Sequence, residues 1–215
     1  MKTVRTTKKE VVTAFRTREI LAAARSLLEQ GGVEGLTMDG IAAAAGVAKG
    51  TLYLYFPSKE ELIQEMLSQA GENLLAALES LINTPRPPEE KLRQVVTWLL
   101  NHLERERVLF PVFMQELRRE RSGEPGRGRR LQDLEEKIMA KLTGLFAEGI
   151  AQGQFIPADP RLFTFLVMGL VRAVGHYQMA AGREGAVKEA LPVLSTLIFS
   201  GLRQRPHPSE EVPPA

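Results

Sequence analysis

Histidine and cysteine are the residue types that most often build catalytic and metal sites, and this chain spaces them for neither. Its three histidines, His102, His176 and His207, are scattered, and none has a partner at the spacing of a metal site or a catalytic triad. The chain has no cysteine, which excludes disulfides, thiolate nucleophiles and cysteine-bound zinc. We therefore expect no catalytic residue, no metal and no cofactor, and these patterns argue against an enzyme.

A different kind of chemistry is suggested by KGTLYLYF, residues 49–56. Its alternation of aromatic and branched residues is typical of a strand, but a single strand between two capped helices would have no strand to pair with. As a helix, the segment places Leu52 and Phe56 on one face and Gly50 and Leu54 on the opposite one. Because glycine inside a helix costs about 1 kcal/mol relative to alanine, Gly50 indicates close approach of another molecule.

The elements around this segment predict how it is held. A first helix with an apolar face ends at Gly32, and Thr37 is placed to cap a second helix. Gly46 provides a tight turn, and Ser58 with Glu61 forms a capping box that starts a long helix. Two helices joined by a glycine-containing turn form a helix-turn-helix, whose second helix enters the DNA major groove. The alternative is a helix of a bundle core with both of its tyrosines half-buried.

Helical periodicity continues through the rest of the chain, and no strand pattern or repeat accompanies it. Residues 121–130 read as a mobile basic loop, and the proline-rich residues 205–215 read as a disordered tail. The prediction is an all-α fold of roughly nine helices. Beyond the helix-turn-helix, the predicted helices cover residues 58–83, 89–106, 108–120, 131–152, 160–181 and 186–203.

Composition sets the class of protein. At 44% apolar and 25% charged, the chain has the composition of a soluble globular protein. Its apolar stretches are shorter than the ~18 residues that span a bilayer, and the N-terminus lacks the apolar segment of a secretory signal, so we expect a cytoplasmic location. The net charge is +2, yet the first eighteen residues hold six basic residues against Glu10. Residues 1–15 are thus a candidate basic arm for DNA phosphates, or simply a solvated tail.

The segment LTMDGIAAAAGVAKGTLYLYFPSKEELIQEML, residues 36–67, resembles the DNA-binding segment of the tetracycline-repressor (TetR) family of bacterial transcriptional regulators. Close matching covers about residues 16–67, and the remainder agrees in length and helical layout. The resemblance implies a three-helix DNA-binding domain over residues 16–60 and a C-terminal helical effector-binding and dimerisation domain over residues 61–204.

The resemblance also implies roles for individual residues. Thr37 and Tyr55 are expected to contact phosphates, Lys59 to clamp a phosphate, and Leu54 to touch a thymine methyl. Bases or phosphates are expected to meet Lys49, Gly50, Thr51 and Tyr53. One departure is Ala48, where the family commonly has serine. Since alanine cannot cap a helix with its side chain, we expect the recognition helix to be looser until DNA orders it.

For the C-terminal domain, the resemblance implies an effector pocket and a C2 homodimer that reads a palindromic operator. Methionines adapt to irregular shapes, which favours a hydrophobic effector. His102 follows Trp98 by one helical turn, and His176 follows Arg172 similarly; these pairs either pack or line the pocket against a polar or anionic group. The candidate pocket residues are Met66, Trp98, His102, Phe110, Phe113, Met114, Phe146, Met168, Arg172, His176 and Tyr177.

The last two helices carry stripes that are too apolar for the surface of a monomer. Small residues within them permit close helix approach. The resemblance implies that these helices form a four-helix bundle between two subunits, with an intrachain core as the alternative. The candidate interface residues are Leu166, Gly169, Leu170, Ala173, Leu191, Leu194, Leu197, Ile198 and Leu202.

The function expected from these features is that of a ligand-responsive dimeric regulator, most often a repressor in the family it resembles, which a small molecule releases from DNA. A ligand-independent nucleoid or division factor of the same fold is the alternative within DNA binding. An enzyme on a helical scaffold would need converging titratable groups, which the sequence does not offer.

Overall fold

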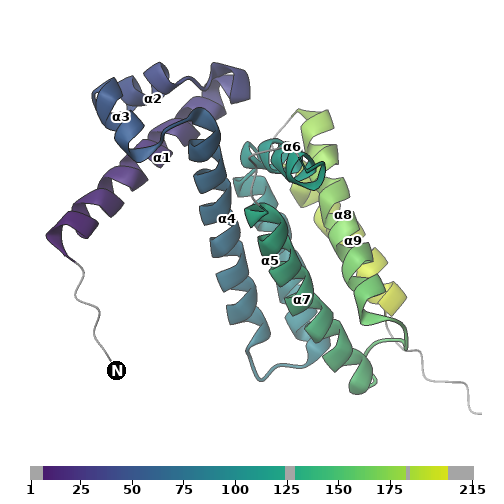
Figure 1. The fold of residues 1–215 in the computed structure, drawn as a ribbon. Helices are drawn as coiled ribbons and strands as arrows, with labels where there is room; N and C mark the ends of the chain where they lie inside the picture. The colour runs from purple at the N-terminus through teal and green to yellow at the C-terminus, as the bar shows by residue number, and fades with distance from the viewer. Residues whose placement is uncertain (1–6, 124–128, 183–184, 203–215) are drawn as a thin grey trace, which may run out of the picture. The chain divides into compact units, whose positions relative to one another are not determined.

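A computed structural model describes residues 7–123, 129–182 and 185–202 (Figure 1). Within these ranges the chain is all-α, as predicted, and contains no β-strand. The helices are α1 (Lys8–Gly35), α2 (Met38–Ala44), α3 (Lys49–Tyr55), α4 (Lys59–Ile82), α5 (Pro88–Arg105), α6 (Leu109–Arg121), α7 (Arg130–Ala151), α8 (Pro160–Ala181) and α9 (Ala186–Leu202). Residues 124–128 of the predicted loop and the whole predicted tail, residues 205–215, lie outside the described residues. The loop was predicted one residue too long at each end, because Arg121 belongs to α6 and Arg130 to α7.

Local capping determines where several helices begin. The Thr37 hydroxyl accepts a hydrogen bond of 3.1 Å from the Gly40 amide, and the Ser58 hydroxyl accepts one of 3.1 Å from the Glu61 amide. Pro160 occupies the first turn of α8, where its missing N–H costs nothing. The predicted starts of α2, α4 and α8 are therefore confirmed.

The first helix begins earlier than expected. The Thr7 hydroxyl accepts from the Glu10 amide at 3.3 Å, and the Glu10 carboxylate accepts from the Thr7 amide at 2.6 Å, which completes a capping box. The hydrogen bond from the Thr7 backbone, followed by that from its side chain, lowers the pKa of Glu10. The predicted flexible arm over residues 1–15 is thus wrong from residue 8 onward, and residues 1–6 lie outside the described ranges. As predicted, Gly32 interrupts the helix, with a φ of 63°.

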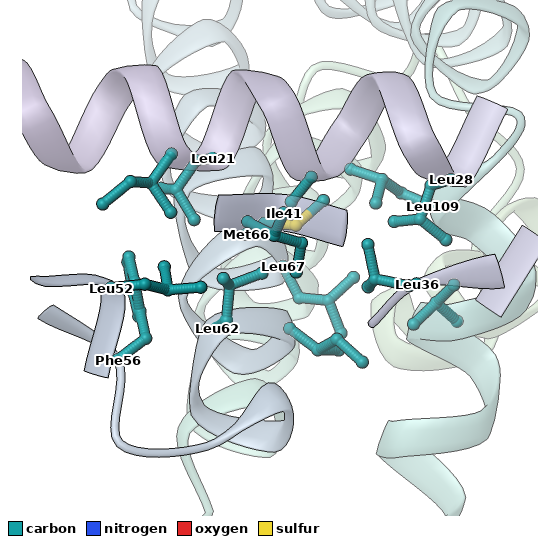
Figure 2. Packing of buried hydrophobic residues seen from close by; sticks show 14 of the residues in the cluster. Leu21, Leu28, Leu36, Ile41, Leu52, Phe56, Leu62, Met66, Leu67 and Leu109 are labelled. Atoms are coloured by element: carbon teal, nitrogen blue, oxygen red, sulfur yellow. The ribbon is translucent and has the colours of Figure 1, made fainter. Parts of the chain in front are cut away.

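Two compact units divide the chain. The first comprises the described residues up to Glu72 together with Val108–Leu131, and the second comprises Asn73–Arg107 with the residues from Gln132 onward. In the first unit, buried side chains from α1, α2, α3, α4 and α6 meet in one core (Figure 2). Leu62 and Met66 of α4 belong to this core, as does Leu109 of α6. The predicted domain boundary after residue 60 therefore does not coincide with the edge of this unit.

In the second unit, α8 and α9 pack against α5, and aromatic rings link α7 to α8. The Phe146 ring lies 5.6 Å from that of Phe163 and 5.8 Å from that of Phe155. The Phe155 ring packs on Gly149 so closely that a Cβ at position 149 would overlap it. Any larger residue at this position would therefore require movement of the ring.

Three of the predicted dimer residues lie in the core of the second unit. Leu194, Ile198 and Leu202 of α9 are 5%, 4% and 6% exposed. Their periodicity reflects packing of α9 within its own chain, where its neighbours are α5 and α8. For these three residues, the intrachain alternative is correct.

Candidate nucleic-acid interface

The helix-turn-helix is formed by α2, a turn at Gly46 and α3. Gly46 has a φ of 64°, and the Val47 amide donates to the Ala42 carbonyl at 3.0 Å, which closes the turn. Ile41 of α2 and Leu52 of α3 are fully buried in the core shared with α1 and α4 (Figure 2). The turn and the shared core together fix the orientation of α3.

The structure confirms that KGTLYLYF is helical up to Tyr55 and has two faces. Leu52 and Phe56 are 0% and 5% exposed, whereas Leu54 is 85% exposed and Tyr53 42% exposed. In a strand, residues 52, 54 and 56 would share one face, so the isolation of Leu54 is a direct signature of the helix. The outward face thus presents an apolar side chain and a phenol to the surroundings.

The remaining residues of α3 vary in exposure. Lys49 and Gly50 are exposed, whereas Thr51 and Tyr55 are half-buried, and Tyr55 packs against the core. A Cβ added at Gly50 would meet no atom of the described chain within 4 Å. Packing within the chain therefore does not require glycine here, and α3 keeps an open surface at this position.

The start of α3 lacks a side-chain cap, as predicted for Ala48. Lys49 instead forms an ion pair with Asp39 of α2, whose carboxylate lies 2.7 Å from the ammonium. The hydrogen bond to Asp39, followed by the charge of Asp39, raises the pKa of Lys49. From the sequence, Asp39 is only a favourable acid in the first turn of α2, because no local spacing links it to Lys49.

Lys59 is engaged within the protein. Its ammonium donates a hydrogen bond of 2.9 Å to the Val33 carbonyl near the end of α1, and the residue is half-buried. This contact ties the start of α4 to the turn that follows Gly32. An ammonium has three N–H donors, so two remain for a phosphate. The hydroxyl of Thr37, which is exposed, accepts from the Gly40 amide and can still donate its own proton.

The predicted pocket residues are divided between the two units. In the first unit, Met66 is buried in the core and Phe113 packs against it, while Phe110 and Met114 are half-buried. In the second unit, Phe146 is fully buried and Met168 is half-buried. Each unit thus contributes apolar side chains from the predicted set.

The polar members of the predicted pocket have partners of their own. The rings of Trp98 and His102 stack with centroids 4.8 Å apart, and Arg172 forms an ion pair of 2.7 Å with Glu135. His176 is exposed, and the Tyr177 hydroxyl donates to Glu189 at 3.4 Å. Of the two alternatives for Arg172 and His176, the contact with Glu135 favours packing within the chain, since a carboxylate already neutralises the Arg172 guanidinium.

A polar hollow of about 340 Å³ in the second unit includes none of the predicted pocket residues. In its wall, the buried Lys91 forms an ion pair with Glu148 at 3.0 Å. The hollow is lined by Thr84, Pro85, Arg86, Pro87, Lys91, Glu148, Gln152 and Gln154.

The other predicted dimer residues lie at or near the surface of α8 and α9. Leu166 and Leu197 are 54% and 59% exposed, Gly169 and Ala173 are exposed, and Leu170 and Leu191 are half-buried. Four further exposed apolar residues of these helices were not predicted, because periodicity does not show which face of an apolar helix is covered. They are Leu162, Phe165, Met179 and Val193.

Two classes of site find no support in the described ranges. No helix there combines the length and apolar character needed to cross a membrane. The same residues contain no cluster of three or more histidine, aspartate or glutamate side chains that could hold a metal ion.

Comparison with known proteins places these features in a family. Residues 20–66 match "Bacterial regulatory proteins, tetR family", and residues 85–186 match "Tetracyclin repressor-like, C-terminal domain". The chain is 26% identical over 153 residues to the transcriptional repressor KstR2 of Mycolicibacterium smegmatis, a match that covers 67% of this chain and 69% of KstR2.

Solved structures agree with this fold. The fatty acid degradation regulator FadR of Bacillus halodurans has a TM-score of 0.73 and 25% identity, over 88% of this chain and 97% of that one. FadR of Bacillus subtilis, solved in complex with stearoyl-CoA, has a TM-score of 0.71 and 22% identity, over 86% and 98% of the two chains. With both halves matched and the helix-turn-helix in place, the chain belongs to the TetR family of bacterial transcriptional regulators.

Proposed function

We propose that this regulator is a dimeric repressor that binds a palindromic operator through α3 and leaves it when a small molecule binds the C-terminal domain. The observation that carries the proposal is the outward face of α3, where Leu54 and Tyr53 are exposed beside Gly50 on a helix whose other face is buried. A helix that is held by one buried face and leaves the other uncovered is what insertion into a major groove requires.

The proposed DNA contacts fall into two groups. Lys49, Gly50, Thr51, Tyr53 and Leu54 meet base edges or the adjoining backbone, with Leu54 against a thymine methyl. Phosphates are contacted by residues with N–H or O–H donors, which orient the domain without reading sequence. These donors are Thr37, Tyr55 and Lys59.

The proposed dimer uses the exposed parts of α8 and α9. Leu166 and Leu197 supply apolar area, and Gly169 and Ala173 permit close approach of the partner helix. In a C2 dimer the same patch meets itself, and the two α3 helices read half-sites about one DNA turn apart or somewhat more.

The proposed effector has a long apolar chain. The apolar side chains of the predicted pocket support it, as does the stearoyl-CoA bound to the related FadR of Bacillus subtilis. By linkage, an effector that weakens DNA binding must be bound more weakly by the DNA complex, by the same factor. A ligand-independent factor of the same fold would show no such coupling.

A mobility-shift titration with a duplex that spans the protein's own promoter region tests the DNA contacts. Tyr53→Ala should weaken binding by about 1–3 kcal/mol while leaving the unfolding free energy nearly unchanged, because its side chain is on the surface. Tyr177→Ala is a matched control, since this tyrosine is similarly exposed but lies in the second unit. Equal affinity of wild type and Tyr53→Ala would refute the proposed base contact.

The effector proposal is tested by adding stearoyl-CoA, free coenzyme A or stearate to the preformed DNA complex. Release by stearoyl-CoA or stearate, with no release by coenzyme A, would support an apolar effector site. No release by any of the three, with DNA binding intact, would refute this effector class and favour the ligand-independent alternative.

A further inference from the structure

The ion pair between Asp39 and Lys49 joins the two helices of the helix-turn-helix. Asp39 is in the first turn of α2, Lys49 is the first residue of α3, and their charged atoms are 2.7 Å apart. Both side chains are largely exposed, at 69% and 59%. An exposed pair of this kind adds little to folding stability, so stability alone does not explain it.

The pair changes what Lys49 can do. A free lysine ammonium is attracted by any phosphate, whatever the DNA sequence. Here the Asp39 carboxylate, 2.7 Å away, already accepts from one of the three N–H donors of Lys49. A phosphate can bind the Lys49 ammonium only in competition with the Asp39 carboxylate, and this carboxylate also repels the phosphate.

A base edge differs from a phosphate because it can carry hydrogen-bond donors as well as acceptors. The carboxylate of an aspartate can accept a hydrogen bond from the amino group of cytosine or adenine, while an ammonium can donate to guanine O6 or N7. A suitable base step therefore satisfies both members of the pair, whereas the DNA backbone satisfies only Lys49.

We infer that Asp39 is a specificity-determining residue, which restrains Lys49 from contacting phosphates and so weakens binding to DNA of arbitrary sequence. This inference rests on the proposed DNA-binding function. Asp39 acts through Lys49 as a positioning residue and, at the operator, also faces a base amino group.

The size of the effect follows from counterion release. When the logarithm of the binding constant is plotted against the logarithm of the salt concentration, each lysine that newly neutralises a phosphate makes the slope steeper by about 0.9. If the added contact contributes nothing at about 1 M salt, this slope makes binding about fivefold tighter at about 0.15 M salt. For the two subunits of a dimer, Asp39→Asn should tighten non-specific binding by about 30-fold and steepen the slope by about 1.8.

The test compares two duplexes, one selected by the wild-type protein from a random library and one with the same bases scrambled. Asp39→Asn should bind the scrambled duplex about 30-fold more tightly, with a steeper salt slope, and should gain much less on the selected duplex. Asp39→Glu should retain the wild-type ratio of the two affinities, for the selected duplex and for the scrambled one. A misfolded variant would bind both duplexes more weakly, so tighter binding cannot result from damage to α2.

Glu29→Gln is a matched control, because it makes the same change of charge in the same unit and removes an ion-pair partner of Arg25 on α1. It should leave the ratio unchanged. A gain by Asp39→Asn that is equal on both duplexes, or equal to that of Glu29→Gln, would overturn the inference while leaving DNA binding intact. Failure of the wild type to bind any duplex would overturn the proposed function and the inference with it.

Discussion

Two leucines of α3, Leu52 and Leu54, should respond in opposite ways to the same substitution. Leu52 is 0% exposed and Leu54 is 85% exposed. Leu52→Ala removes buried methyl groups and leaves a cavity, which costs about 3–5 kcal/mol of unfolding free energy. Leu54→Ala removes atoms that are already in water, so the unfolding free energy should change by no more than about 0.5 kcal/mol.

The assay is urea unfolding followed by circular dichroism, together with titration of the promoter duplex. Leu54→Ala should keep the wild-type unfolding curve and lose affinity for DNA by about 1 kcal/mol or more, since it loses contact with a thymine methyl. Leu52→Ala should shift the unfolding midpoint to lower urea concentration and lose DNA affinity as a consequence of unfolding.

Equal destabilisation by the two substitutions would refute the two-faced helix, because a strand would place both side chains on the same face. Unchanged DNA affinity in Leu54→Ala, with the stability contrast intact, would refute only the assigned base contact.

Local geometry leads to three more expected outcomes. In thermal unfolding, Gly149→Ala should lower the unfolding free energy by about 1–3 kcal/mol, because the new methyl group would overlap the Phe155 ring. Gly144→Ala, which has open space on the same helix, should be neutral or stabilising in this assay. The lowered pKa of Glu10 means that its stabilisation of α1 is present above its unfolded pKa and is lost as the pH falls through the lower folded value, so the amide protection factors in the first turn of α1, corrected for the intrinsic exchange rate at each pH, should fall over that range; protection factors that do not change with pH would contradict this. Ala48→Ser should supply the missing cap and stabilise α3 by about 1 kcal/mol, and unchanged amide protection of α3 would count against a loosely started recognition helix.

Signals that lie within one helical turn predicted the fold well. The caps at Thr37 and Ser58 gave correct helix starts, because each depends on a hydrogen bond between residues three apart. Gly32 correctly marked the interruption of α1, where its backbone is non-helical. The early start of α1 is also encoded locally, since Thr7 and Glu10 have capping-box spacing. The basic composition of residues 1–15 favoured a flexible arm, but composition says less about helix formation than a cap does.

Contacts between distant residues were beyond the reach of these patterns. Lys59 meets the Val33 carbonyl, and Lys49 meets Asp39, only because the fold of the first unit brings separate helices together. Because every residue has a backbone carbonyl, no residue type in the sequence indicates that Val33 is the partner of Lys59. The candidate site was therefore predicted residue by residue on α3, but its internal ion pair was not.

The apolar content of α8 and α9 posed a related ambiguity. Periodicity identifies apolar residues but not whether the surface that covers them belongs to the same chain or to another. Leu197 and Ile198 are both large aliphatic residues, and residue type alone does not distinguish them. In the fold, Ile198 is buried, whereas its neighbour Leu197 is 59% exposed.

The stacking of Trp98 on His102 gives the protein a built-in optical probe. Trp98 is the only tryptophan of the chain, and it lies in the second unit, on α5. Intrinsic fluorescence excited in the tryptophan band therefore reports on the second unit, whereas the DNA-reading helix lies in the first. A change in that emission when DNA is added would be a direct optical signal of communication between the two halves of the regulator, obtained without any label.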